Sequence, residues 1–182
     1  MRDKQHSVAK AIELKVDHVS QLFDTLDPFP FRERDLDKDA EEFIVGWARE
    51  LPRDQPLKVI VHVPEAEATT LKAAELPSAF ARYFNDRAEV SVLDLKELFR
   101  VGWRALAIGL VVLASCIIVG QMITGRVGQG YFGRFVEESL VILAWVANWR
   151  PIEILLYDWW PLLRRRNLYL RLAAAAVELR HH

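Results

Sequence analysis

The sequence predicts a mainly α-helical protein, in which a small α/β module is followed by a transmembrane helical hairpin. Charge is the first observation behind this division: residues 1–100 hold 15 Lys and Arg against 20 Asp and Glu, and residues 101–182 hold 9 against 5. Hydropathy is the second, because residues 105–125 contain no charged side chain. The 182-residue chain is 52% hydrophobic and 27% charged, which excludes a disordered protein. We therefore expect a cytoplasmic module at 1–100, a two-helix transmembrane hairpin at 101–163 and a basic cytoplasmic segment at 164–182.

The first membrane span is predicted at residues 105–125, with the sequence ALAIGLVVLASCIIVGQMITG. As a helix, a run of this length extends about 30 Å, the thickness of the hydrocarbon core of a bilayer. A buried helix of a soluble protein is the alternative, but it needs a core larger than a chain of this size supplies. A signal peptide is excluded because the run lies in the middle of the chain and the first 20 residues are charged.

A second, shorter span is predicted in residues 135–163. Its charge-free part, 139–149, is brief, but Arg150 can extend toward the headgroups at one end. The connection, ITGRVGQGYFGRF at 123–135, is short and glycine-rich, as a turn between antiparallel helices should be. The two spans thus form a hairpin.

Basic residues near the spans predict the orientation. They flank the hairpin on the side of the two chain termini, whereas the short loop carries only two arginines. The positive-inside rule then places both termini in the cytoplasm. The arginines after the second span also suit anionic lipid headgroups, and this topological role makes nucleic-acid binding unnecessary to explain them. They are Arg164, Arg165, Arg166 and Arg171.

Two strands and one helix are predicted in the module. Residues 11–16 and 56–63 alternate apolar and polar side chains, which is typical of strands. Residues 36–51 fit a helix with Asp37 as its N-cap, ended by Pro52. Two strands joined by a crossover helix should be parallel, and helices or another chain must cover them. The apolar face of the helix is expected to comprise Ala40, Phe43, Ile44, Trp47, Ala48 and Leu51.

Three further segments carry expectations. The prolines of Asp27–Phe31 exclude a helix, and its phenylalanines either cover their own core, which we favour, or dock a partner. After an interruption at Pro77, one helix is expected from about Ser78 to Thr124; the alternative places a third strand at 90–92. Residues 164–180, rich in Ala, Leu and Arg, should be helical.

The sequence carries no motif for a reaction. The single cysteine, Cys116, excludes an internal disulfide and a cysteine-based zinc site, and the histidines lack metal-ligand spacing. No phosphate-binding glycine motif and no serine nucleophile beside a histidine is present. We therefore expect no catalytic residue, no metal site and no cofactor, and a protein that is not an enzyme.

The most informative polar group is Arg150, followed by Glu153 and Asp158. Arg150 and Glu153 are three residues apart, so they share a helix face and can neutralise each other. At membrane depth, such charges mark a pathway or the counter-charge of a partner. We favour the alternative that they lie at the inner interface. Small residues at four-residue spacing also permit close helix packing within the hairpin or between subunits: Ala105 with Gly109, and Cys116 with Gly120 and Thr124.

Two stretches carry a resemblance, LFDTLDPFPFRERDLDKDAEEFIVGWAREL at 22–51 and WRPIEILLYDWWPLLRRR at 149–166. With them, the chain resembles a bacterial family of small two-span inner-membrane proteins to which no reaction is assigned. The resemblance covers most of residues 12–170. It implies an inner-membrane location and supplies no catalytic residue.

Two functions follow as expectations. The first is a non-enzymatic inner-membrane protein that acts as an accessory or scaffold subunit, in contact with the bilayer and its anionic lipids and part of a homo-oligomer or a larger complex. The second is a transporter or channel component that uses Arg150 and Glu153; since two helices cannot enclose a pore, it requires an oligomer. A membrane-bound enzyme has no residue in its favour.

Overall fold

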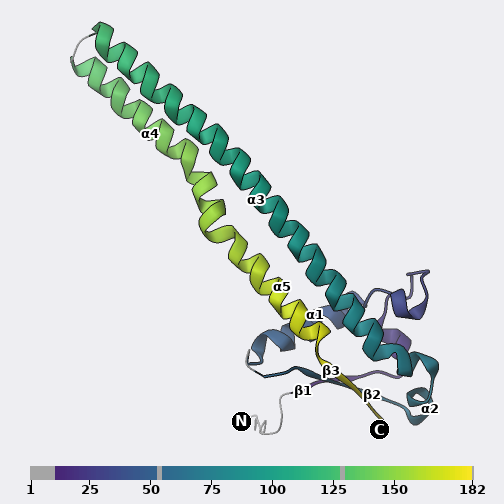
Figure 1. Cartoon of the computed structure of the whole chain (residues 1–182). Helices are drawn as coiled ribbons and strands as arrows, with labels where there is room; N and C mark the ends of the chain where they lie inside the picture. Colours follow the sequence, from purple (N-terminus) through teal and green to yellow (C-terminus); the bar gives the residue numbers. More distant parts are fainter. Residues whose placement is uncertain (1–10, 53–54, 128–129, 182) are drawn as a thin grey trace, which may run out of the picture. The chain divides into compact units, whose positions relative to one another are not determined.

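The structure is a computed structural model that describes residues 11–52, 55–127 and 130–181. The chain is mostly helical and contains one three-stranded sheet (Figure 1). The strands are β1 (Ala11–Lys15), β2 (Lys58–Val63) and β3 (Ala176–His181), and the α-helices are α1 (Lys38–Glu50), α2 (Glu65–Ala68), α3 (Leu71–Val127), α4 (Tyr131–Glu153) and α5 (Trp159–Ala173). Short 3₁₀ turns span Val19–Leu22 and Phe31–Glu33, and a π-helical turn, Ile154–Asp158, joins α4 to α5.

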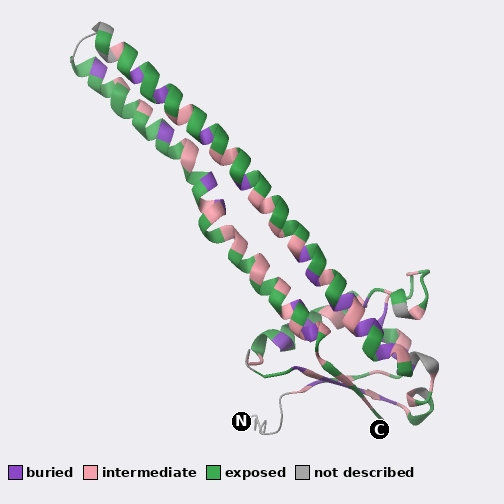
Figure 2. Ribbon diagram, viewed as in Figure 1, coloured by how far each residue is buried: buried purple, intermediate pink, exposed green. Residues whose placement is uncertain are grey.

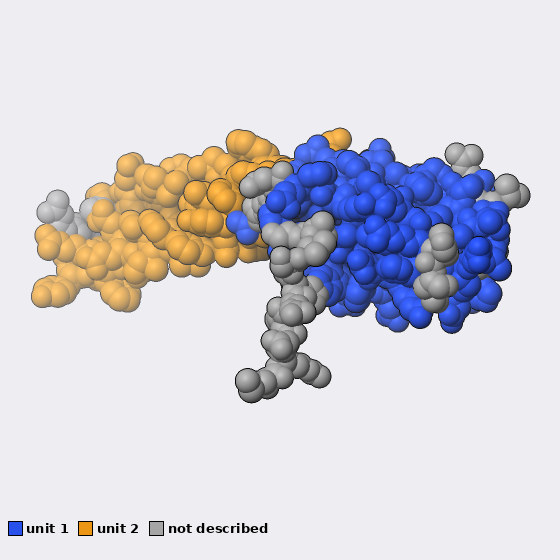
Figure 3. Space-filling model, turned by 90° about the horizontal axis from the view of Figure 1, so that it is seen from below, with its two compact units in different colours: residues 1–90, 164–182 blue, residues 91–163 orange. Residues whose placement is uncertain are grey.

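The chain divides into two compact units, which Figure 3 distinguishes by colour. One unit, called the module below, consists of residues 1–90 together with 164–182. The other, called the hairpin, consists of residues 91–163. The module is therefore built from both ends of the chain, and the hairpin is inserted into its sequence.

The sheet of the module is parallel, with β2 in the centre and β1 and β3 at the edges. The two predicted strands and their parallel pairing are confirmed, with Ile12 opposite Val59 and Leu14 opposite Val61. Because side chains alternate along a strand, Val59, Val61 and Val63 point to one face, where they join the buried core formed with α1, α3 and α5. Figure 1 shows these helices on one side of the sheet.

Ionisable side chains occupy the other face of the sheet. Lys58 of β2 lies 2.6 Å from the carboxylate of Glu178 on β3, and His62 Nε2 lies 3.5 Å from Glu13 on β1. Ile60 is buried between Glu13 and Glu178 in the register. This polar face explains why β2 alternates in hydropathy, although most parallel strands are apolar on both faces.

The third strand corrects the expectation for the C-terminus. The predicted helix is present only as far as Ala173, and residues 176–181 form β3 beside β2. The four alanines at 173–176 favour a helix. Pairing with β2 and packing of Val177 and Leu179 against the core outweigh that preference. The sheet therefore obtains its missing strand from the same chain.

The helix predicted at 36–51 is confirmed as α1, and Asp37 caps it by accepting bonds from the backbone N–H groups of Asp39 and Ala40. The expected apolar face is largely confirmed: Ile44 and Ala48 are buried, together with Val45, and Ala40 and Leu51 pack against the core. Phe43 and Trp47 remain 44% and 43% exposed, with ring centroids 6.1 Å apart. Phe43 and Trp47 are thus the two residues of the expected face that do not lie in the core.

A single helix, α3, replaces both the break expected at Pro77 and the alternative strand at 90–92. Pro77 removes one backbone donor, which normally costs helix stability. It lies only in the second turn, however, and its neighbours Leu76, Ala79 and Phe80 are buried in the core. Packing therefore carries the helix through the proline.

The Asp27–Phe31 segment is non-helical up to the 3₁₀ turn that starts at Phe31, as its prolines predict. Phe31 packs against Phe23, with ring centroids 4.6 Å apart, whereas Phe29 is 58% exposed. Backbone N–H groups of Phe29 and Asp35 donate to the Asp27 carboxylate and lower its pKa. One phenylalanine thus covers its own core, and the other faces outward.

Candidate functional site

Two helices of the structure, Ala73–Ile123 and Tyr131–Ala173, are long and apolar enough to cross a membrane. Only 17% of the most apolar window of each is buried, and Figure 2 shows mainly exposed residues along α3 and α4. A core helix of a soluble protein would be mostly buried instead. Both helices therefore expose most of their apolar surface.

The charged cluster around Arg150 lies at the end of α4. Arg150 Nη1 is 2.9 Å from Glu153 Oε2, so the predicted pairing of these two residues is confirmed. Arg150 Nη2 is also 3.4 Å from Asp158 Oδ2. One guanidinium thus faces two carboxylates, and the cluster carries one net negative charge when all three groups are ionised.

The π-helical turn explains how Asp158 reaches Arg150. In a regular α-helix, a residue eight positions on is rotated by about 80° from the first. The wider turn at Ile154–Asp158 accommodates one extra residue, which brings Asp158 back to nearly the same face as Arg150. The turn follows Pro151, whose missing N–H already weakens the regular hydrogen-bond pattern. Turns of this kind are frequent at functional sites.

A polar contact joins the two helices of the hairpin. Asn148 Nδ2 of α4 donates to the Gly109 carbonyl of α3 at 3.1 Å and to the Ala144 carbonyl at 2.8 Å. A Cβ at Gly109 would lie 2.6 Å from Asn148 Oδ1, so only glycine leaves the required space. Gly109, Cys116 and Gly120 are all buried, which agrees with close packing within the hairpin.

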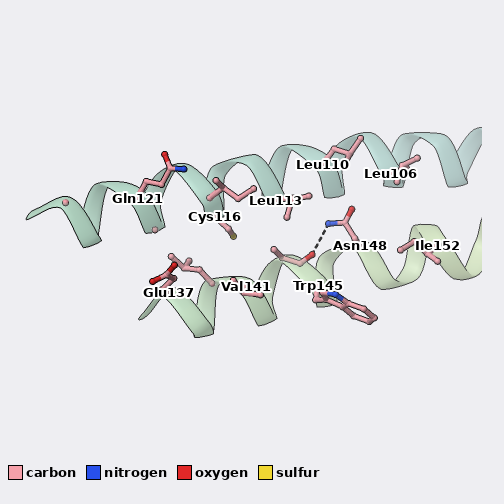
Figure 4. A pocket seen from close by; sticks show the side chains of 15 residues that line it. Leu106, Leu110, Leu113, Cys116, Gln121, Glu137, Val141, Trp145, Asn148 and Ile152 are labelled. Carbon is pink, nitrogen blue, oxygen red and sulfur yellow. Dashed lines mark hydrogen bonds between the residues drawn. The ribbon is translucent and has the colours of Figure 1, made fainter. Parts of the chain in front are cut away.

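A groove of about 1020 Å³ runs along the same two helices (Figure 4). Small residues, Cys116, Gly120 and Ala144, are among those that line it, and Glu137 lies toward its loop end. A second hollow of about 610 Å³ is lined by Arg134, Glu137, Glu138, Val141 and Ile142. Glu137 and Val141 line both, so the two adjoin along α4.

The basic residues after the second predicted span have individual contacts. Arg165 Nε donates to the Tyr169 hydroxyl at 3.1 Å, and its guanidinium lies over the Tyr169 ring, 5.7 Å from the centroid. Arg171 Nη2 donates to the backbone carbonyls of Pro52 and Gln55 at 2.7 and 3.2 Å. These two arginines therefore bind the module itself, a role that sequence reasoning missed. Arg164 is exposed and Arg166 is partly buried.

A network around Glu41 in the module was also missed. Glu41 Oε2 accepts from the Tyr83 hydroxyl at 2.8 Å and from Arg87 Nη2 at 3.0 Å, and Oε1 accepts from the Tyr169 hydroxyl at 3.2 Å. Burial, and next the bond to Glu41, raise the pKa of Tyr83. A single carboxylate thus ties α1 to both α3 and α5. These residues are 42 to 128 positions apart in sequence, and no local pattern could have indicated their meeting.

The described residues contain no group of three or more His, Cys, Asp or Glu side chains that could hold a metal ion. Comparison with protein-family models, curated proteins and solved structures finds no match to this chain.

Proposed function

We propose that this chain is a two-pass protein of the bacterial inner membrane, with both termini in the cytoplasm, that serves as a non-enzymatic accessory or scaffold subunit of a larger assembly. The observation that carries the membrane location is the exposed apolar surface along both long helices. In water, an apolar surface of this extent would drive aggregation, whereas lipid would cover it without cost. The sequence resemblance described above points to the same location.

Membrane insertion and orientation are tested by extraction and labelling. Insertion predicts that the protein stays in the membrane fraction after alkaline carbonate treatment. For orientation, a Gly130→Cys variant is made in a Cys116→Ala background. It should react with a membrane-impermeant maleimide in intact spheroplasts. Release by carbonate would contradict insertion, and labelling only after lysis would contradict the orientation.

The scaffold role is supported by the aromatic pair on α1. Phe43 and Trp47 are each more than two-fifths exposed on α1, with ring centroids 6.1 Å apart. Exposed aromatic rings are enriched at the centres of protein interfaces, where they supply much of the binding energy. We therefore assign this pair as the partner-docking surface of the module.

Affinity purification after gentle solubilisation tests the scaffold role. The wild-type chain should retain a stoichiometric partner, and the Phe43→Ser/Trp47→Ser double variant should lose it. Leu26→Ser is the matched control, because Leu26 is 89% exposed in the same unit and lies outside the aromatic pair. A partner retained equally by all three proteins, or absent from the wild type, would contradict the proposal.

A second function, a component of an oligomeric transporter or channel, is favoured by the Arg150 cluster alone. Three charged groups in one candidate spanning helix, beside a π-helical turn, fit a pathway for an ion or proton. Arg150→Leu separates the two functions. Abolished flux in an intact assembly would support transport, whereas a defect in insertion or assembly alone would support the scaffold role.

A further inference from the structure

The groove of the hairpin is lined mainly by apolar residues, and the second hollow beside it is lined by Arg134, Glu137 and Glu138. This arrangement matches an amphiphilic molecule. We propose that they bind one zwitterionic phospholipid with an amine headgroup, at the end of the hairpin near the loop. This inference rests on the proposed membrane location. It assigns the acyl chains to the groove and the headgroup to the hollow around Arg134 and Glu137.

Size argues for a lipid chain rather than a protein helix in the groove. A helix that crosses the membrane is about 10 Å wide and 30 Å long, which corresponds to roughly 2400 Å³. The groove measures about 1020 Å³, close to the upper limit of small-molecule pockets, about 1,000 Å³. Its volume is therefore that of a small-molecule pocket and less than half that of a spanning helix.

The lining of the groove separates an apolar body from a polar end. Among the polar residues that line the groove, Asn148 is the farthest from the loop. Both N–H groups of its side-chain amide already donate, to the Gly109 and Ala144 carbonyls. Near the loop, Glu137 supplies a carboxylate to both the groove and the hollow. A bound molecule must therefore be apolar along most of its length and cationic at one point.

Arg134 completes the charge pattern. It precedes Glu137 by three residues on α4, so the two side chains share a face of the helix. Within the described residues, neither of them forms an ion pair, and both are exposed. A headgroup that carries a phosphate and an ammonium matches this pair, with the guanidinium on the phosphate and the Glu137 carboxylate on the ammonium. A purely anionic headgroup would satisfy Arg134 but would meet the Glu137 and Glu138 carboxylates.

The thickness of one leaflet fixes how far the lipid extends into the groove, whose lining continues to Leu106 and Ile152. From Gly125 to Cys116, α3 rises by about 14 Å, which is half of the hydrocarbon core. A lipid of the leaflet on the loop side would therefore fill the groove as far as Cys116 and Ala144. Figure 4 shows Cys116 pointing into the space between the helices. Gly120 lies within this half, and a Cβ there would approach only Leu140 Cδ1, at 3.8 Å, so a side chain can enter the groove.

Native mass spectrometry of the full-length protein tests the proposal. The protein is reconstituted in nanodiscs with equal amounts of phosphatidylethanolamine and phosphatidylglycerol, and the lipids retained on ejection are counted. We expect phosphatidylethanolamine to be retained in preference. Glu137→Gln should reduce this preference about twofold to fivefold, the range for one exposed ion pair, and Arg134→Gln should reduce retention of both lipids. Glu97→Gln and Arg104→Gln, exposed residues of α3 outside the groove, are the matched controls.

A second pair of variants tests the acyl part. Gly120→Leu should fill the groove and lower lipid retention, whereas Val119→Leu, at an exposed neighbour outside the lining, should not. Equal retention of the two lipids by the wild type would overturn the proposal. So would a Gly120→Leu variant that loses an oligomer or a partner while its lipid retention stays unchanged, because a protein would then occupy the groove. Failure of carbonate-resistant insertion would instead overturn the membrane location itself.

Discussion

Asn148 of α4 donates its side-chain N–H to the backbone carbonyl of Gly109 on α3, at 3.1 Å, and so connects the two helices of the hairpin. Gly109 makes this contact possible, because the Cβ of any other residue at this position would lie 2.6 Å from Asn148 Oδ1. A partly buried polar side chain in an apolar hairpin thus bonds to a backbone carbonyl that a glycine leaves accessible. The contact fixes the register of the two helices at this level.

Gly109→Ala should destabilise the hairpin. Alanine normally favours a helix over glycine by about 0.5–1 kcal/mol, but here it displaces Asn148 and breaks an interhelical bond of about 0.6–1.7 kcal/mol. Gly125→Ala is the control, because nothing lies within 4 Å of its Cβ position, and it should be neutral or stabilising. Unfolding of the purified protein by SDS in mixed micelles measures the difference. Equal stability of the two variants would mean that the contact contributes nothing.

Patterns within short stretches of the sequence were sufficient to predict much of this fold. Alternation located β1 and β2, Asp37 located the start of α1, and the charge-free run located the long apolar helix. The Arg150–Glu153 pair also followed from spacing within one helix. Each of these features depends on residues close together in the sequence, where periodicity and capping act.

Features that depend on distant partners were missed. The strand β3 reads AVELR at 176–180, which matches AIELK of β1 at 11–15 with a conservative change at two positions. This repeat was the available signal, and the four alanines before Val177 concealed it because they favour helix. The link from Arg150 to Asp158 needed a π-helical turn, and the Glu41 network needed three helices to meet, neither of which any local spacing predicts.

Glu41→Gln should lower the stability of the module by about 1–3 kcal/mol. The carboxylate accepts bonds from Tyr83, Arg87 and Tyr169, and the amide replaces one acceptor oxygen by a donor facing these groups. Thermal unfolding of the full-length protein in detergent, followed by circular dichroism, measures the loss. Glu42→Gln is the control, since Glu42 is exposed on the same helix. A loss of the same size in both variants would show that the network is not the cause.

Stability of the module should fall as the pH rises above about 10, the ordinary pKa of tyrosine. Burial and the bond to Glu41 raise the pKa of Tyr83, so the folded protein holds this proton more tightly than the unfolded chain. The contribution is therefore complete below pH 10 and is lost progressively above it. Urea unfolding between pH 9 and 11 measures the decline. Tyr83→Phe should show a shallower decline, whereas Tyr157→Phe, at an exposed tyrosine, should follow the wild type.

Leu179→Asn should destabilise the module by about 1–3 kcal/mol, whereas Arg180→Asn should have little effect. Both residues lie in β3, but Leu179 packs against the core and pairs with Val61 in the register, whereas Arg180 lies on the polar face of the sheet. The asparagine at 179 leaves a polar amide against apolar neighbours, and the one at 180 remains in contact with water. Limited proteolysis of the full-length protein reports the result, because a released β3 exposes residues 174–181 to cleavage. Equal resistance of the two variants would contradict the role of β3 in the core. Faster cleavage of both would indicate that strand pairing alone, rather than the partly buried leucine, holds this end of the chain.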